Sequence, residues 1–124
     1  MTYLNFLARF LVLAILVFLL GCTKSFEVED AGKMQEFYIS HSGPLRDGAS
    51  YPIKITVTGQ IDGKALIYIA PSVTTYNSSY SMTFGLRDRE KILYREITSK
   101  NSVIVYKPIT AKKGKLTIKV EFKN

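Results

Sequence analysis

The side chains best suited to catalysis or metal binding are scarce in this sequence. It has one cysteine, Cys22, and one histidine, His41, among 124 residues. A zinc site needs three or four His, Cys or acidic ligands, so no transition-metal site is expected. His41 has a serine beside it, but it precedes Gly43-Pro44, which predicts a turn, and it has no G-x-S-x-G context. We therefore expect no catalytic residue, no metal and no cofactor.

The ten acidic residues also lack the spacing of a reactive site. Glu27, Glu29 and Asp30 lie close together, but they match no calcium-binding loop. Nothing marks out two other carboxylates as the pair that glycoside hydrolysis requires. Because no phosphate-binding or dinucleotide-binding glycine motif occurs either, the sequence predicts a protein that is not an enzyme.

One segment has a composition typical of ligand contact. Residues 71–79 (PSVTTYNSS) predict a loop. Tyr76 and Asn77 within it, and Tyr80 directly after it, supply two aromatic rings and one side-chain amide. Sugar-binding and protein-binding loops use such mixtures, because the rings supply contact area at a low entropy cost. Alternatively, Tyr76 and Tyr80 cap the core at one end of the domain, an interpretation that the absence of tryptophan favours.

The N-terminal segment is strongly apolar. Residues 10–20 (FLVLAILVFLL) form an unbroken apolar run that follows a short segment containing Arg9. As a helix this run would be about 16 Å long, too short to cross a hydrocarbon core of about 30 Å. Its length instead matches the apolar region of a secretory signal peptide.

This run ends in Leu19-Leu20-Gly21-Cys22, which resembles the lipobox of bacterial lipoprotein precursors. The resemblance covers residues 1–22. It implies that residues 1–21 are a signal peptide cleaved between Gly21 and Cys22, and that Cys22 carries lipid chains such as palmitate. The protein would then be anchored in a membrane of the cell envelope. Thr23, which is not aspartate, favours the outer membrane in a host that has one.

The net charge of +7 is distributed unevenly. From Lys100 onward, seven lysines stand against one acid, Glu121. A basic face can attract anionic lipid, polyanionic glycan or nucleic acid. The simpler interpretation is that these lysines solubilise the outer face of a C-terminal strand and protect an exposed sheet edge. Nucleic acid is not expected as a partner, because the N-terminal segment indicates export.

Strand signals dominate after residue 22, and no helix is expected there. Residues 51–58 and 115–123 alternate between apolar and polar side chains. Inward positions are expected at Ile53, Ile55, Val57, Leu116, Ile118, Val120 and Phe122. After the first of these segments, Asp62-Gly63 predicts the two-residue turn of a hairpin whose second strand is residues 65–70. That hairpin would place Val57 opposite Tyr68, and Ile55 opposite Ala70.

These signals predict a single all-β domain over residues 35–124. About seven antiparallel strands are expected to form a β-sandwich, immunoglobulin-like or similar, with a small barrel as the alternative. Residues 22–34 are expected to be the lipidated cysteine and a flexible tether. The predicted function is a lipid-anchored envelope lipoprotein with a binding, structural or accessory role, whose partner is an envelope protein or a polysaccharide. The alternative is a carbohydrate-binding module of a cell-surface glycan system.

Overall fold

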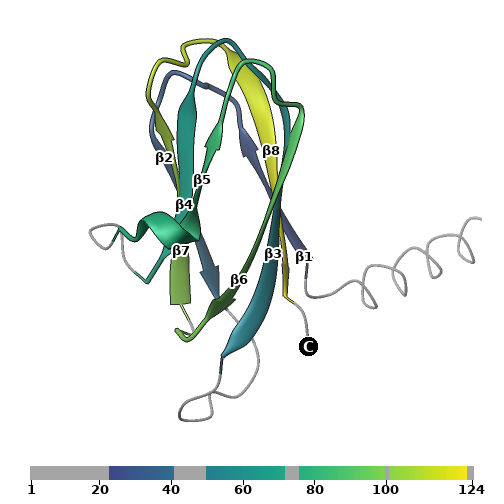
Figure 1. The fold of residues 1–124 in the computed structure, drawn as a ribbon, viewed down its shortest axis with the longest axis vertical. Coiled ribbons are helices and arrows are strands. Elements are labelled where there is room, and N and C mark those ends of the chain that lie inside the picture. The colour runs from purple at the N-terminus through teal and green to yellow at the C-terminus, as the bar shows by residue number, and fades with distance from the viewer. Residues whose placement is uncertain (1–22, 41–49, 72–75, 100, 123–124) are drawn as a thin grey trace, which may run out of the picture.

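The computed structural model describes residues 23–40, 50–71, 76–99 and 101–122, in which eight β-strands and one short 3-10 helix are present (Figure 1). The elements are β1 (Thr23–Val28), β2 (Gln35–Ser40), β3 (Tyr51–Ile61), β4 (Ala65–Ala70), η1 (Ser78–Tyr80), β5 (Ser81–Phe84), β6 (Glu90–Ile97), β7 (Asn101–Pro108) and β8 (Gly114–Phe122). In this part of the chain no helix has the length and apolar character needed to cross a membrane.

Two four-stranded antiparallel sheets form a sandwich, which confirms the predicted fold class. Sheet A has the strand order β1-β8-β3-β6, and sheet B has the order β2-β7-β4-β5. Successive strands lie in different sheets, except for β4 and β5, which are neighbours in sheet B. This order is that of a jelly roll, in which two Greek keys are folded over one another, and it differs from the immunoglobulin order.

The predicted hairpin between β3 and β4 is wrong. Val57 of β3 lies opposite Ile118 in sheet A, whereas Tyr68 of β4 lies opposite Val105 in sheet B. The predicted pairing of Ile55 with Ala70 is absent for the same reason. Apolar alternation shows which face of a strand is buried, but a hairpin and a crossing between two sheets bury that face equally well. Asp62-Gly63 therefore forms a corner between the sheets.

This corner is fastened to the corner between β7 and β8. The Asp62 carboxylate accepts the backbone N–H groups of Lys112 at 2.7 Å and Lys113 at 2.9 Å. These hydrogen bonds hold the pKa of Asp62 below its ordinary value. A Cβ atom on Gly63 would lie 2.7 Å from the carbonyl carbon of Thr110, so only glycine allows the two corners to approach this closely.

The segment expected to be a flexible tether is largely part of the sandwich. Thr23–Val28 forms β1, which pairs with β8 from Thr23 opposite Glu121 to Val28 opposite Leu116. Val28 and Ala31 are completely buried. The sequence of β1 is polar in four of its six positions because it is an edge strand with one open side, and this weakened its strand signal.

The core lies between the two sheets. Sheet A contributes the inward positions expected from the sequence, and these are buried except for half-buried Phe122. Sheet B contributes Phe84 of β5, Tyr106 of β7 and several isoleucines. The Tyr106 hydroxyl donates a buried hydrogen bond of 2.7 Å to the carbonyl oxygen of Ala31, which joins the connection after β1 to sheet B.

The buried Tyr106 hydroxyl makes stability depend on pH at the alkaline end. Burial, helped by the charges of Asp62 and Asp30, raises its pKa from 10.0 to about 12. The unfolded chain releases this proton first, so the stabilisation is complete below about pH 10 and is lost as the pH rises through about 12. We expect a loss on the order of 2 kcal/mol in the free energy of unfolding.

Urea titrations between about pH 8 and pH 12 would measure this loss. Tyr106→Phe is the control, because it keeps the ring and removes the proton. Its free energy of unfolding should fall less steeply over this range than that of the unmodified protein. Parallel pH profiles for the two proteins would show that Tyr106 does not carry the effect.

Candidate functional site

The three residues expected at a ligand-contact loop are placed in different environments. Tyr80 is half-buried and packs against the main core, as expected for a residue that caps the sandwich end. Asn77 caps η1, and its side-chain oxygen accepts hydrogen bonds from the N–H and the hydroxyl of Ser79 at 3.0 and 2.8 Å. Tyr76 is 52% exposed and makes an edge contact with Tyr68, with ring centroids 5.1 Å apart.

A pocket of about 230 Å³ lies at the end of the sandwich where β4 and β6 finish. Its lining includes Ala70, Asn77, Tyr80, Glu96, Ser99 and Ser102. Three of its polar groups are already hydrogen-bonded. The Glu96 carboxylate accepts the hydroxyl of Ser50 at 3.2 Å, and the hydroxyls of Ser99 and Ser102 lie 3.1 Å apart.

A second candidate surface is the outer face of sheet B, which carries a small apolar cluster of its own. Tyr38 of β2 lies opposite Val103 of β7, which lies opposite Ala70 of β4. In the next row, Val105 lies opposite Tyr68. We call these five residues, together with Tyr76, the tyrosine face.

The tyrosine face has an apolar floor and exposed rings above it. Val103, Val105, Ala70 and Tyr68 are buried, because their neighbours across the strands and Tyr76 surround them. Tyr38 is 68% exposed, although it stands on the same face of the sheet. Exposed rings beside buried apolar residues leave flat apolar area available to a ligand.

Polar groups surround this apolar floor. The Tyr38 hydroxyl donates a hydrogen bond of 2.9 Å to the Glu36 carboxylate, which raises the pKa of Tyr38 and fixes the direction of its ring. On the other side, the Ser40 hydroxyl donates to the side-chain oxygen of Asn101 at 2.8 Å. The face therefore combines rings with hydroxyl and amide groups that can form directional hydrogen bonds.

The exposed tyrosine of sheet A is arranged differently. Tyr94 of β6 is 59% exposed, but the Nζ atom of Lys54 lies 5.8 Å from the centre of its ring. This is the geometry of a cation–π contact, so a cation of the protein itself covers one face of the ring. Tyr94 is therefore a suitable control for the tyrosines of sheet B.

Most of the described Lys and Arg residues lie at one end of the sandwich. We call this the distal end, defined by the connections 29–34, 62–64, 85–89 and 109–113; it lies opposite the end at which Thr23 starts β1. With the first or last two residues of the adjoining strands it carries the nine cations Lys33, Lys64, Arg87, Arg89, Lys91, Lys107, Lys112, Lys113 and Lys115 and the seven acids Glu27, Glu29, Asp30, Glu36, Asp62, Asp88 and Glu90. The remaining described charges are Lys24, Lys54, Arg95 and Lys119 against Glu96 and Glu121.

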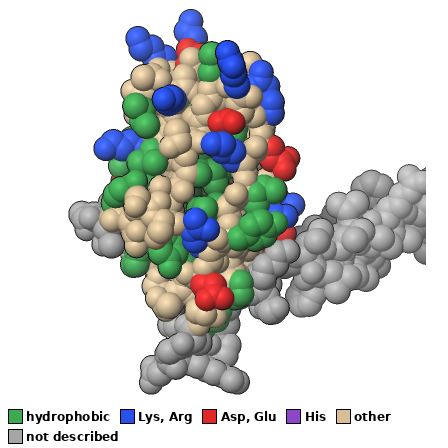
Figure 2. Space-filling view, viewed as in Figure 1, with side chains coloured by type: hydrophobic (Ala, Val, Ile, Leu, Met, Phe, Trp, Pro, Cys, Tyr) green, Lys and Arg blue, Asp and Glu red, His purple; other side chains and the backbone are tan. Residues whose placement is uncertain are grey.

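Lys and Arg side chains are correspondingly frequent at the upper end of the molecule in Figure 2. The interpretation that the C-terminal lysines protect a sheet edge is wrong, because β8 lies between β1 and β3 inside sheet A. The lysines of β8 stand on the outer face of an internal strand.

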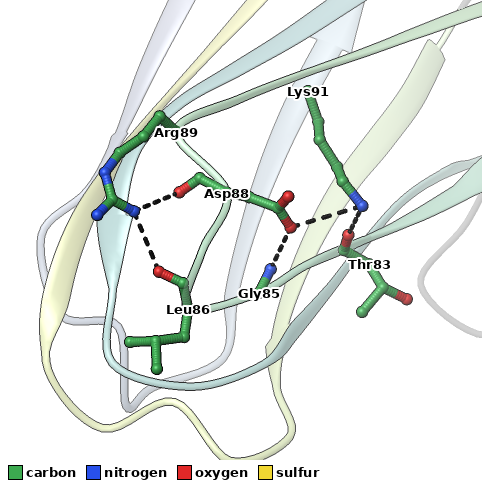
Figure 3. Close-up of polar contacts among 6 residues, drawn as sticks. All are labelled: Thr83, Gly85, Leu86, Asp88, Arg89 and Lys91. Atoms are coloured by element: carbon green, nitrogen blue, oxygen red, sulfur yellow. Dashed lines mark hydrogen bonds and ion pairs between the residues drawn. The ribbon is translucent and has the colours of Figure 1, made fainter.

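Some distal cations are bound within the connection between β5 and β6 (Figure 3). The Asp88 carboxylate accepts the N–H of Gly85 at 2.7 Å and forms an ion pair of 3.5 Å with Lys91. Nη1 of Arg89 donates to the carbonyl oxygens of Leu86 and Asp88, both at 3.0 Å. These two cations stabilise their own turn, so they are less available to a partner than the lysines of the other connections.

Two predicted site residues, Gly21 and Cys22 at the expected processing and lipidation site, lie outside the described residues. The same is true of His41, for which no catalytic role was expected. Within the described ranges, no group of three or more His, Cys, Asp or Glu side chains could hold a metal ion. The tyrosine face was missed by the sequence analysis except for Tyr76. Alternation around Phe37 and Ile39 could have placed Tyr38 on an outer face, but no local signal brings it next to Val103.

Comparison with known proteins gives similarities of fold only. No protein-family model and no curated protein match the chain. A solved structure described as "CBM4 structure and function" is similar with a TM-score of 0.46 and 11% identity, over 82% of this chain and 71% of that chain. The coat protein of Tobacco streak virus is similar with a TM-score of 0.36 and 5% identity, over 81% of this chain and 85% of that chain. At these levels of similarity, no functional argument follows.

Proposed function

We propose that this chain is a non-enzymatic, lipid-anchored bacterial envelope protein that binds a polysaccharide through the tyrosine face. The anchor is supported by the lipobox-like sequence that ends at Cys22. The observation that carries the binding function is the outer face of sheet B, where exposed Tyr38 and Tyr76 flank a buried apolar floor. Of the two partners expected from the sequence, this proposal selects the polysaccharide.

The chemistry of the tyrosine face suits a sugar ring. A sugar has apolar C–H faces and a rim of hydroxyls, so its ligand site needs flat apolar area and directional hydrogen-bonding groups. Tyr38 and Tyr76 supply the area, and tyrosine loses little entropy on binding because it has only two side-chain torsions. Glu36 and Asn101 supply oxygens at the rim, close to Tyr38. The pocket at the other candidate site has a volume of about 230 Å³, below the range of about 300–1,000 Å³ that is usual for ligand pockets.

The proposed anchor fixes how the tyrosine face would lie relative to the membrane. Consecutive Cα atoms are about 3.8 Å apart, so Cys22 is adjacent to the first residue of β1 and no long spacer separates lipid from domain. The end of the sandwich that carries Thr23 would lie nearest the membrane. The row of Tyr38, Val103 and Ala70 lies toward this end, and Lys107 and Lys64 lie toward the distal end, which would point away from the lipid.

Tyr38→Ala and Tyr76→Ala are expected to weaken polysaccharide binding by about tenfold or more each, equivalent to about 1.4 kcal/mol. Affinity electrophoresis or calorimetry with polysaccharide extracted from the envelope would measure the effect. Tyr94→Ala should bind like the unmodified protein, because that tyrosine lies on the outer face of sheet A. Equal binding by all three variants, or no binding by the unmodified protein, would contradict the proposal.

A further inference from the structure

The lysines of the distal end stand on a rigid base. The carbonyl oxygen of Lys64 accepts three backbone N–H groups from residues 109–111, at 2.9, 3.0 and 3.1 Å. The N–H of Asp62 donates to the carbonyl oxygen of Lys113 at 3.0 Å, and Asp62 in turn caps Lys112 and Lys113. The backbones that carry Lys64, Lys112 and Lys113 are therefore held together, while their side chains are exposed.

The lysines of the distal end differ in how far nearby acids offset their charge, and Lys113 helps to lower the pKa of Asp62. Within the described residues, no ion pair involves Lys64, Lys107, Lys112, Lys113 or Lys115. The nearest acid in sequence, Asp62, directs its carboxylate to backbone N–H groups. Asp30 forms its ion pair with Lys33, at 3.8 Å. The distal end thus keeps a small excess of positive charge, and among the described residues Lys64 and Lys107 stand outside its ion pairs.

This basic surface is continuous with the tyrosine face through Lys107. Lys107 lies on β7 two residues after Val105, so both side chains stand on the outer face of sheet B. Their rows are about 7 Å apart along the strand. Lys107 lies opposite Leu66, which packs against the apolar cluster of the tyrosine face. A chain-like ligand that passes from Tyr76 over half-buried Leu66 would therefore meet Lys107 and then Lys64 at the distal end.

We infer that the ligand of the tyrosine face is an anionic polysaccharide, whose sugar rings contact Tyr38 and Tyr76 and whose acid groups contact Lys107 and Lys64. This inference rests on the proposed function and adds the charge of the ligand. The acid groups are carboxylates or phosphates, which lysine binds alike as a point charge. A polymer fits better than a small anion, because the lysines are spread over a surface and do not converge on one pocket.

Glu36, an acid beside the tyrosine face, would repel an anionic ligand. Its position therefore limits where the acid groups of the ligand can lie. Glu36 lies opposite Val105, but its carboxylate accepts the hydroxyl of Tyr38. Glu36 stands on β2. Strand β7 separates it from β4, which begins directly after Lys64. The acid groups of the ligand are therefore expected along β7 and β4, on the side away from Glu36.

Binding of four polymers to the full-length protein in non-ionic detergent would test the inference. The polymers are polygalacturonate, its fully methyl-esterified form, a phosphomannan and the dephosphorylated mannan, so that carboxylate and phosphate are each compared with a neutral match. We expect at least one acidic polymer to bind about tenfold or more tightly than its neutral match at about 50 mM salt, and most of this advantage to disappear at about 500 mM salt.

The double variant Lys64→Glu/Lys107→Glu should lose about tenfold or more in affinity for the acidic polymer and should keep its affinity for the neutral one. Lys24→Glu is the matched control, an exposed lysine on β1 near the opposite end, and it should change neither by more than about twofold. Unchanged urea midpoints would show that the variants are folded.

The outcomes separate this inference from the proposed function. Equal binding to acidic and neutral polymers, still weakened by Tyr38→Ala, would overturn the anionic ligand and leave the tyrosine face as a sugar site. No effect of the tyrosine variants on any polymer would overturn the proposed function and this inference with it. Binding to phosphatidylglycerol vesicles in place of every polymer, abolished by the lysine variants, would also overturn the inference, in favour of a membrane surface.

Discussion

Cys22→Ala is expected to transfer the protein completely from the membrane fraction to the soluble fraction. Each buried methylene contributes about 0.8 kcal/mol to membrane binding, so one acyl chain anchors reversibly and two or more anchor stably. No other cysteine is present to take the lipid. Labelling with an alkynyl fatty acid, followed by detergent phase partition, would measure both the modification and its consequence. The variant should lose the label and leave the detergent phase.

Ser25→Ala is a suitable control for this experiment, because Ser25 is an exposed residue of β1 close to the lipidation site. It should be labelled and partition like the unmodified protein. A labelled Cys22→Ala variant would contradict lipidation at this residue. A variant that loses the label but remains in the detergent phase would show that another part of the protein holds it at the membrane.

Phe84→Ala is expected to produce the largest loss of stability, about 3–5 kcal/mol in the free energy of unfolding. Phe84 is completely buried where β5 ends, between the two sheets. Its removal loses apolar burial and leaves a cavity that the surrounding strands of two sheets cannot readily fill. Since domains of this size have a stability of about 5–15 kcal/mol, the variant should be only marginally folded.

Urea denaturation followed by circular dichroism would measure the change, and Leu86→Ala provides a control only two residues away. Leu86 is 54% exposed because it lies beyond the end of β5, and its truncation should cost less than about 0.5 kcal/mol. Similar losses in the free energy of unfolding for Phe84→Ala and Leu86→Ala would contradict the prediction that buried Phe84 is important for the stability of the core.

The tether illustrates why a short polar segment is difficult to assign. β1 contains Lys24, Ser25 and Glu27, and half of its surface faces solvent at the sheet edge. Its contribution is made by Phe26 and Val28, two residues that acquire a clear role only when β8 lies beside them. Because β1 is part of the sandwich, the proposed lipid would lie next to a rigid strand.

The candidate site shows the same division. Tyr76 was recognised from the composition of its own loop, whereas Tyr38 and Tyr68 were not. These two residues are 30 positions apart and lie on the two strands that flank β7. Their proximity follows from the jelly-roll order, which no local pattern reveals. The distal end likewise depends on the tertiary structure, because two corners of the fold bring Lys64 and Lys112 together.

The sequence by itself determined that the domain is all-β, and it identified the inward positions of β3 and β8. Those features depend on the alternation of side chains along one strand, which is a local property. Only the tertiary structure decided which sheet each strand joins, that Thr23–Val28 belongs to the domain, and that tyrosines and lysines form a continuous surface. These features depend on hydrogen bonds and packing between residues far apart in the chain, for which alternation carries no information.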